Sequence, residues 1–176
     1  FKSLTNLLYK SKNGRILTDN DERFAYFSKA SLSTLPHLFW KPNVLICNGW
    51  QTSMTPIIYK QIYESKVFYD KIKTVLTIHS LDEYSNFSRQ SYEIAGVKLP
   101  SNIKGDNVNC YEAAAPYADL IITVDTPESK TYDDFIKIPG MKSFKDKIAS
   151  VKIDDIENPD FDLISNTINE KLIKNF

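Results

Sequence analysis

The sequence predicts an α/β protein with a three-layer, Rossmann-like fold built on a mainly parallel sheet. Short runs rich in β-branched residues alternate along the chain with stretches of helical spacing, and this alternation is typical of βαβ units with helices on both faces of a sheet. The two clearest runs, at residues 43–47 and 73–79, are largely apolar and lead into polar residues. Buried strands of a parallel sheet have this pattern, and their carboxyl ends line the ligand crevice.

The first half of the chain is expected to form two helices and two strands. Polar capping residues precede residues 22–35, where apolar and aromatic side chains recur at helical spacing. We therefore predict a helix that carries Phe24 and Phe27 on its inner face and ends at Pro36. Pro56 is compatible with the next helix because it lies near the helix start. The elements expected here are a helix at 22–35, a strand at 43–47, a helix at 52–63 and a strand at 73–79.

The second half begins with a long segment, residues 80–107, which lacks a sustained period and collects Ser, Asn, Gly and Pro. We expect a surface excursion there with one short helix at residues 88–95, since loops of this length in compact domains are usually functional or mobile. Regular patterns return after it. The elements expected are a helix at 109–117, a strand at 119–124, a helix at 127–138, a strand at 148–153 and an amphipathic helix at 161–174.

Composition and charge narrow the class of protein. The chain carries 22 Lys and Arg and 22 Asp and Glu, so no net field draws it to nucleic acid or to an anionic membrane. Its apolar runs are too short to cross a bilayer and no signal segment opens the chain, so we expect a cytoplasmic protein. Cys47 and Cys110 have neither the number nor the spacing of a disulfide framework or a zinc site. We expect buried, reduced thiols and no bound metal.

The candidate site follows from the polarity of the strands. Asn48 and Trp50 come directly after the first clear strand, and His79 ends the second. Because carboxyl ends of neighbouring parallel strands meet at one edge of a sheet, these side chains are expected to lie along the same edge. A Gly-rich dinucleotide loop, a phosphate-binding P-loop and a nucleophile elbow are all missing from the sequence, which excludes the enzyme classes that depend on them.

Five short segments carry a resemblance to a known family. They are, in order, Asp19-Asn20-Asp21-Glu22-Arg23-Phe24-Ala25, Phe39-Trp40-Lys41-Pro42-Asn43-Val44, Asn48-Gly49-Trp50-Gln51-Thr52, Thr74-Val75-Leu76-Thr77-Ile78-His79-Ser80-Leu81 and Tyr117-Ala118-Asp119. In this order and spacing, they resemble the amino-terminal catalytic domain of bacterial glycogen synthases and plant starch synthases. These are family 5 glycosyltransferases with the two-domain GT-B fold. The resemblance covers residues 18–162 and implies that residues 1–176 form a single domain, the amino-terminal half of a GT-B fold.

The resemblance also implies a reaction and a set of site residues. Enzymes of this family transfer glucose from ADP-glucose to an α-1,4-glucan without a metal or another cofactor. The family's histidine after the second strand lies near the transferred glucose, which implies a catalytic role for His79. An imidazole at a strand end can hydrogen-bond a sugar hydroxyl or stabilise charge near the reacting carbon. The residues implied in substrate binding are Asn48, Trp50, Gln51, Ser80 and Tyr84.

Several positions depart from the family's pattern. Gly49 stands where the family has an acidic residue, Ser80 where it has Asn, and Glu112 where it has Lys. Residues 82–85 replace the family's Ala-Tyr-Gln-Gly, and the Lys-x-Gly-Gly-Leu loop that contacts the nucleotide-sugar is missing. We therefore expect a chain that is truncated at its amino end and lacks the carboxy-terminal GT-B domain. The α-glucan acceptor and a second chain that supplies the other GT-B half are the partners expected.

Two other interpretations stay open at the level of sequence. The altered polar positions favour a degenerate, non-catalytic member that binds glucan or a partner protein, because a working site needs its polar groups held closely in place. The other interpretation is an unrelated α/β binding domain in which Trp50 and His79 are core or loop residues. A sheet with Asn48 and His79 at opposite edges would favour this last interpretation.

Overall fold

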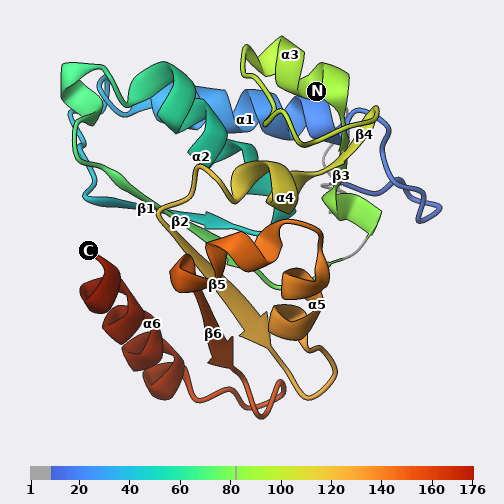
Figure 1. Cartoon of the computed structure of the whole chain (residues 1–176), viewed down its shortest axis with the longest axis vertical. Coiled ribbons are helices and arrows are strands. Elements are labelled where there is room, and N and C mark those ends of the chain that lie inside the picture. Colours follow the sequence, from blue (N-terminus) through green and yellow to red (C-terminus); the bar gives the residue numbers. More distant parts are fainter. Residues whose placement is uncertain (1–8, 82) are drawn as a thin grey trace.

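In the described part of the chain, the central sheet consists of four parallel strands. The computed structural model describes residues 9–81 and 83–176 of the chain, and the strands lie in the order β1-β2-β5-β6 (Figure 1). Their bounds are Val44–Asn48 for β1, Lys73–Ile78 for β2, Leu120–Asp125 for β5 and Ile148–Lys152 for β6. The first three strands predicted from sequence are neighbours, so the prediction of a mainly parallel α/β sheet is confirmed.

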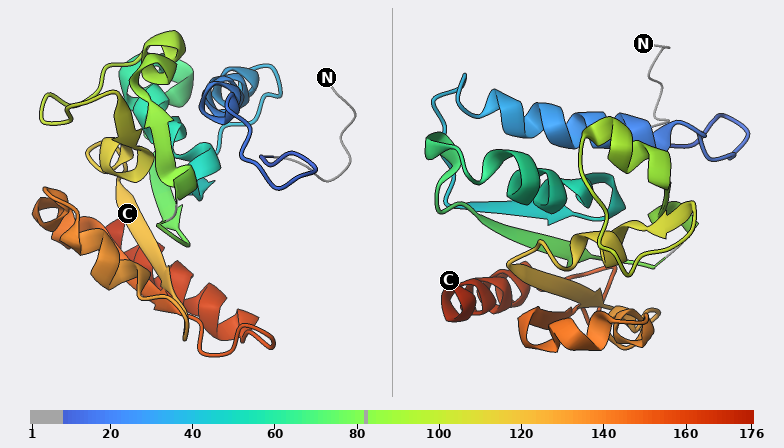
Figure 2. Two further views of the ribbon diagram at one scale, coloured as in Figure 1. Left: turned by 90° about the vertical axis from the view of Figure 1, so that its right-hand side faces the viewer. Right: turned by 45° about the horizontal axis from the view of Figure 1, so that its top comes forward.

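Most helices cover one face of this sheet. They are α1 (Asn20–Thr34), α2 (Met54–Ile58), α4 (Cys110–Ala114) and α5 (Thr131–Lys137), with short 3₁₀ turns at Trp50–Thr52, Val67–Tyr69 and Met141–Lys147. Leu76 and Ile121 of the sheet share one buried cluster with Ile57 of α2 and Phe135 of α5. The predicted helix at 52–63 exists, but its second half is a π-helical turn over Tyr59–Tyr63. Figure 2 shows α1 as an outer layer against α2.

The buried face of α1 differs from the predicted one. Phe24, Ser28 and Leu32 are buried at a spacing of four residues, whereas Phe27 is 53% exposed. The aromatic spacing indicated the helix correctly, but the prediction that Phe27 faces inward was wrong. A periodic pattern identifies a helix more reliably than it chooses between two apolar stripes that overlap on the same helix.

The expected surface excursion at residues 80–107 is the main correction to the predicted fold. It contains a 3₁₀ turn at Glu83–Ser85, strand β3 (Asn86–Ser88) and helix α3 (Arg89–Ala95), and it leads into strand β4 (Asn107–Asn109). β3 and β4 pair in an antiparallel ribbon, and Phe87, Tyr92 and Val108 are almost fully buried. The helix predicted at residues 88–95 is confirmed as α3. The segment is part of the core because most of its apolar side chains are buried, with Ile94 as an exposed exception.

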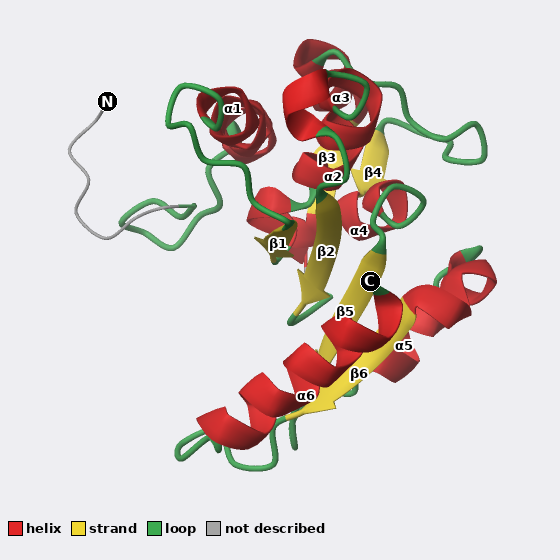
Figure 3. Cartoon of the chain, turned by 90° about the vertical axis from the view of Figure 1, so that its left-hand side faces the viewer, coloured by secondary structure: helices red, strands yellow, loops and turns green. Residues whose placement is uncertain are grey.

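Among the described residues, one helix covers the second face of the sheet. Helix α6 (Phe161–Asn175) follows β6 and lies across it in Figure 3. Its side chains Ile164, Ile168 and Leu172 pack against the sheet residues Val75, Leu120, Ile122 and Val151. The predicted three-layer arrangement is confirmed, with unequal outer layers. No residue of α6 is buried, and Ile46 on the edge strand β1 is 51% exposed. None of the helices in the described ranges is long and apolar enough to cross a membrane.

Candidate functional site

The predicted site residues gather at one edge of the sheet. Asn48 is the last residue of β1, Trp50 and Gln51 begin the 3₁₀ turn that follows it, and His79 and Ser80 come directly after β2. Tyr84 lies in the next turn, at Glu83–Ser85. Asn48 and β2 residue Thr77 are partners in the parallel register, so the strand ends are adjacent. The arrangement that would favour an unrelated α/β binding domain, with Asn48 and His79 at opposite edges, is therefore not observed.

The sheet itself divides this edge into two cavities. The sheet-face cavity lies on the side of α6, has a volume of about 290 Å³, and is lined by Asn48, Thr77 and His79 together with apolar residues of the sheet and Ile164 and Ile168 of α6. The helix-side cavity has a volume of about 350 Å³ and is lined by Trp50 and Tyr84 among others. Asn48 and His79 therefore share one cavity, and Trp50 and Tyr84 share the other.

Asn48 is oriented by the neighbouring strand. Its side-chain oxygen accepts a hydrogen bond of 2.5 Å from the hydroxyl of Thr77, and its backbone carbonyl accepts one of 2.9 Å from the hydroxyl of Thr52. The amide nitrogen of the side chain has no partner among the described residues. An Asn amide with its oxygen occupied presents two N–H donors, so Asn48 can donate hydrogen bonds to a ligand in the sheet-face cavity.

His79 is an exposed residue at the end of β2. Its backbone carbonyl accepts a hydrogen bond of 3.3 Å from the hydroxyl of Thr131, which connects the strand end to α5. Partial burial lowers the pKa of the His79 imidazole below its usual value, because a desolvated ring disfavours the charged form. The neutral ring has one donor and one acceptor nitrogen. It can therefore bind a hydroxyl group in either sense at neutral pH.

Gly49, which stands where the family has an acidic residue, has a backbone conformation that favours glycine. Its φ is +68° and its ψ is −174°, a region of backbone conformation that is almost restricted to glycine. The Gly49 N–H donates a hydrogen bond of 2.9 Å to the carbonyl of Thr77. A Cβ atom at this position would lie 2.9 Å from the side-chain oxygen of Gln51. The absence of a carboxylate is therefore linked to a local backbone shape that favours glycine.

Trp50 is a core residue that contributes to the wall of the helix-side cavity. Only 6% of its surface is exposed. Its ring meets Phe24 edge-on, with 4.9 Å between the ring centroids, and stacks on Tyr84 at 6.0 Å. Tyr9 contacts both Trp50 and Tyr84 edge-on, at 5.7 and 5.4 Å. Since Tyr84 is only partly buried, this half-exposed ring presents more surface to the cavity than Trp50 does.

Two predicted site residues line neither cavity. Gln51 folds toward Gly49, and Ser80 is exposed beyond His79. Conversely, the sequence interpretation missed Asn86 and Asn107, which line the helix-side cavity. The alternation of polar, apolar and polar residues around Phe87 and Val108 was the available signal, but runs of three residues are too short to identify strands.

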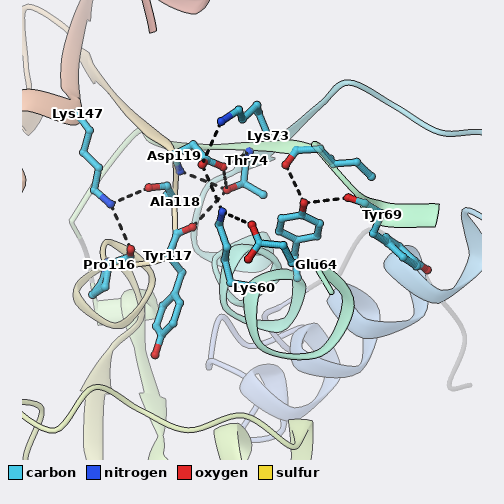
Figure 4. A network of polar contacts seen from close by, with 12 residues as sticks. Lys60, Glu64, Tyr69, Lys73, Thr74, Pro116, Tyr117, Ala118, Asp119 and Lys147 are labelled. Carbon is cyan, nitrogen blue, oxygen red and sulfur yellow. Dashed lines mark hydrogen bonds and ion pairs between the residues drawn. The ribbon is translucent and has the colours of Figure 1, made fainter. Parts of the chain in front are cut away.

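A second polar cluster lies at the opposite edge of the sheet (Figure 4). Asp119 accepts hydrogen bonds of 2.8 and 3.0 Å from the backbone N–H and the hydroxyl of Thr74, and its other oxygen lies 3.4 Å from the ammonium of Lys60. Lys60 also pairs with Glu64 at 2.6 Å. Lys147 donates to the carbonyl of Ala118 at 2.7 Å. These polar groups bind one another, so the cluster connects structural elements and is not a ligand site.

Neither cavity is built to hold a metal ion. No group of three or more His, Cys, Asp or Glu side chains with suitable geometry occurs in the part of the chain that the structure describes. Cys47 and Cys110 are buried and form no disulfide, and burial raises the pKa of the Cys47 thiol to about 12. A protonated thiol is a poor metal ligand and a poor nucleophile. The polar groups available to a ligand are therefore amides, hydroxyls, carboxylates and the imidazole of His79.

Comparisons with known proteins connect this geometry to one family. The sequence model of the starch synthase catalytic domain matches residues 1–142. The glycogen synthase of Clostridium perfringens is 38% identical over 127 residues, which are 69% of this chain and 26% of that protein. The glycogen synthase of Alkaliphilus metalliredigens is 33% identical over 180 residues, 90% of this chain and 34% of that protein. The chain thus spans about a quarter to a third of the length of these relatives.

A solved structure shows the same fold. The catalytic domain of starch synthase IV from Arabidopsis thaliana, bound to ADP and acarbose, superposes with a TM-score of 0.64 and 23% sequence identity. The superposition covers 77% of this chain and 30% of the plant protein. The likeness extends the family match from sequence to the arrangement of strands and helices.

Proposed function

The chain belongs to the family of starch synthase catalytic domains, and on that basis we propose that it is the acceptor-side half of a glycogen synthase-like glucosyltransferase. The reaction proposed is the transfer of glucose from ADP-glucose to the 4-hydroxyl of an α-1,4-glucan, with retention at the reacting carbon and without a metal. Glycogen synthases are the relatives matched over most of this chain. Their names support the substrate class proposed here.

The placement of His79 is the observation that carries this proposal. The ring lies at the carboxyl end of a central parallel strand, lines the sheet-face cavity together with Asn48, and stays partly accessible. Ligands of open α/β sheets bind at this edge. The lowered pKa of His79 keeps its ring neutral near pH 7, so the ring can hydrogen-bond a glucose hydroxyl beside the reacting carbon. Asn48 contributes the N–H donors on the neighbouring strand.

The proposal includes a second polypeptide segment that forms the other wall of the cleft. His79 and Asn48 stand at one open edge, and transfer needs a water-excluding site in which charge stabilisation is already in place. The carboxy-terminal Rossmann domain of a GT-B enzyme would bind ADP-glucose there, and the α-glucan acceptor would approach from this chain. A cytoplasmic location is part of the same proposal, and fractionation of the source cells tests it.

Complementation tests the function directly. The purified 176-residue chain is mixed with the separately expressed carboxy-terminal half of the Clostridium perfringens glycogen synthase, and incorporation of labelled glucose from ADP-glucose into glycogen is measured. We expect no incorporation by either polypeptide alone and incorporation by the mixture. His79→Ala in this chain should lower the rate at least about a hundredfold, as is typical when a group that acts on the transition state is removed.

The matched control is His37→Ala, because the chain has two histidines and His37 lies on the surface after α1, far in the sequence from the strand ends. It should leave incorporation unchanged. A rate for His79→Ala equal to that of the unmodified chain would refute the catalytic role, and turnover by the chain alone would refute the need for a second wall. Failure of every mixture would favour the non-catalytic interpretation.

A further inference from the structure

The helix-side cavity has a polar wall that the catalytic edge does not use. The wall is the antiparallel ribbon of β3 and β4, which lies beside the start of α1 (Figure 1). Phe87 and Val108 are paired across the ribbon and point into the core. Because side chains alternate along a strand, Asn86, Ser88 and Asn107 lie on the opposite face. That face lines the cavity.

The polar groups of this wall are available to a ligand. Within the described part of the chain, the side chains of Asn86, Asn107 and Asp106 make no hydrogen bond or ion pair with the protein, and all three are exposed. They contrast with Asn109 on the same strand, whose side-chain oxygen caps α4 by accepting hydrogen bonds of 3.1 Å from the N–H groups of Tyr111 and Glu112. Two amides and a carboxylate therefore face the cavity with their hydrogen-bonding capacity unused.

The opposite wall is fixed in place by Asp21 at the start of α1. One oxygen of its carboxylate accepts hydrogen bonds of 2.9 Å from the N–H of Ser88 and 2.6 Å from the hydroxyl of Ser91. These bonds join α1 to β3 and α3, so the ribbon and the helix are held at a constant distance. The stacked aromatic rings of Trp50 and Tyr84 also line the cavity. A fixed cavity with an aromatic surface and unpartnered polar groups is suited to binding a small molecule.

The charge of the cavity selects the class of ligand. Asp21 and Asp106 are among its lining residues, and the described lining includes no Lys or Arg, although the ammonium of Lys10 lies 5.1 Å from the centroid of the Tyr84 ring. A phosphorylated ligand such as ADP-glucose would meet two carboxylates in the cavity wall, which is unfavourable. A neutral polyhydroxylated ring meets amides that donate and accept, carboxylates that accept, and an aromatic surface for its C–H groups. The volume of about 350 Å³ lies in the usual range for small-molecule sites.

We propose that the helix-side cavity is a subsite for neutral glucosyl units of the α-glucan acceptor, bound by Asn86, Asn107 and Asp106 and separated by the sheet from the cavity of His79. The inference rests on the proposed function for the identity of the glucan. It assigns the ADP-glucose donor to a different place, because the two cavities differ in charge and lie on opposite sides of the sheet edge. Asn86, Asn107 and Asp106 are binding residues in this assignment, and His79 stays the catalytic residue.

The fluorescence of Trp50 can report ligand binding in the helix-side cavity. The chain contains two tryptophans, and Trp40 is exposed, so Trp40→Phe leaves Trp50 as the single fluorescent reporter in the cavity wall. Titration of this variant with maltoheptaose should give a saturable change in fluorescence. Adding Asn86→Ala and Asn107→Ala should raise the Kd at least about fivefold, because two hydrogen-bonding amides are lost. ADP at the same concentrations should neither produce the change nor compete with maltoheptaose.

The matched control is Asn166→Ala with Asn169→Ala on α6, where both side chains are exposed on the far side of the sheet. It should leave the Kd unchanged. The inference is overturned if maltoheptaose gives no saturable change, if the Asn86 and Asn107 variant binds like its parent, or if ADP competes. In the complementation assay the same variant should raise the KM for glucan and leave kcat unchanged. Binding without any transfer would refute the proposed function and support the subsite, so the two failures are distinguishable.

Discussion

The two ends of the parallel sheet differ in how their polar groups are used. At the amino ends of the strands, Asp119, Thr74 and Lys60 bind one another, and the Tyr59 hydroxyl donates to the carbonyl of Ile72 at 2.8 Å. At the carboxyl ends, the amide nitrogen of Asn48 has no partner among the described residues. The sequence places polar residues at both ends, but only one end keeps hydrogen-bonding capacity for a ligand.

This difference indicates that the amino end contributes mainly to stability and that the carboxyl end is available for ligand binding. Buried polar groups stabilise a fold when their partners are complete, and they are costly when they are left alone. The amino end meets this condition, so substitutions there should lower stability. The carboxyl end is partly exposed to water, so its polar groups tolerate the lack of a protein partner. Substitutions there should alter binding and catalysis with smaller effects on stability.

Breaking the amino-end network should have the largest effect on stability. Asp119→Ala removes the acceptor of two Thr74 hydrogen bonds and the counter-charge of Lys60. We expect the free energy of unfolding to fall by about 2–4 kcal/mol, measured by denaturant titration with circular dichroism. Asp119→Asn keeps an acceptor and should cost about half as much.

The matched substitution at the other end is Asn48→Ala, which removes one bond from Thr77. It should lower the free energy of unfolding by about 0.5–1 kcal/mol. Equal losses for Asp119→Ala and Asn48→Ala would contradict the division between the two ends.

Restoring the missing carboxylate should have an intermediate effect. Gly49→Asp places a side chain on a backbone with φ of +68° and ψ of −174°, and this strain should cost about 1–3 kcal/mol. Asn48→Asp is the control, because it adds the same charge one residue earlier on an ordinary strand backbone. Thermal unfolding measures the loss of stability in each of the two variants. If Gly49→Asp proves as stable as Asn48→Asp, the backbone explanation for the missing acid is wrong.

The pH dependence of Asp21 should give a small effect and sharpen the comparison, because Asp21 is a charged group that supports the carboxyl end. Burial alone would raise the pKa of its carboxyl, but hydrogen bonds from Ser91 and Ser88 outweigh this and lower it. A carboxyl with a folded-state pKa below its unfolded value adds stability above the unfolded pKa, and this stability is lost as the pH falls through the folded value.

Denaturant unfolding of the unmodified chain and of Asp21→Asn should therefore differ by about 1 kcal/mol at pH 7, and the difference should shrink below about pH 4. A difference that stays constant or grows under acid conditions would show that the charge of Asp21 is not what joins α1 to β3.

Local sequence patterns were sufficient for the elements whose residues form continuous apolar runs. The strands at residues 43–47, 73–79 and 119–124 were predicted close to their observed bounds, and so was the terminal helix α6. The segment at residues 80–107 was misjudged, because β3 and β4 are three residues each and are stabilised by pairing with a distant segment. Pairing of that kind leaves no local period in the sequence.

The sequence by itself determined which residues lie at the edge of the sheet. Strand polarity is enough to place Asn48 and His79 on neighbouring strand ends, since parallel strands all end at the same edge. Strand polarity could not decide on which face of the sheet each side chain lies. Trp50 lies two residues after Asn48, yet it packs against Phe24 in the core of the opposite face, because the positive φ of Gly49 redirects the chain between them.

Only the tertiary structure decided which polar groups are left for a ligand. Asn86, Asn107 and Asn109 are the same residue type in one ribbon, and Asn109 is used to cap α4 while the other two face a cavity. A side chain's hydrogen-bonding capacity belongs to the residue, but whether the fold uses it depends on neighbours that are distant in sequence. For that reason the sequence indicated the family and the edge of the sheet at which the proposed catalytic residue lies, and the three-dimensional packing determined the division into two cavities.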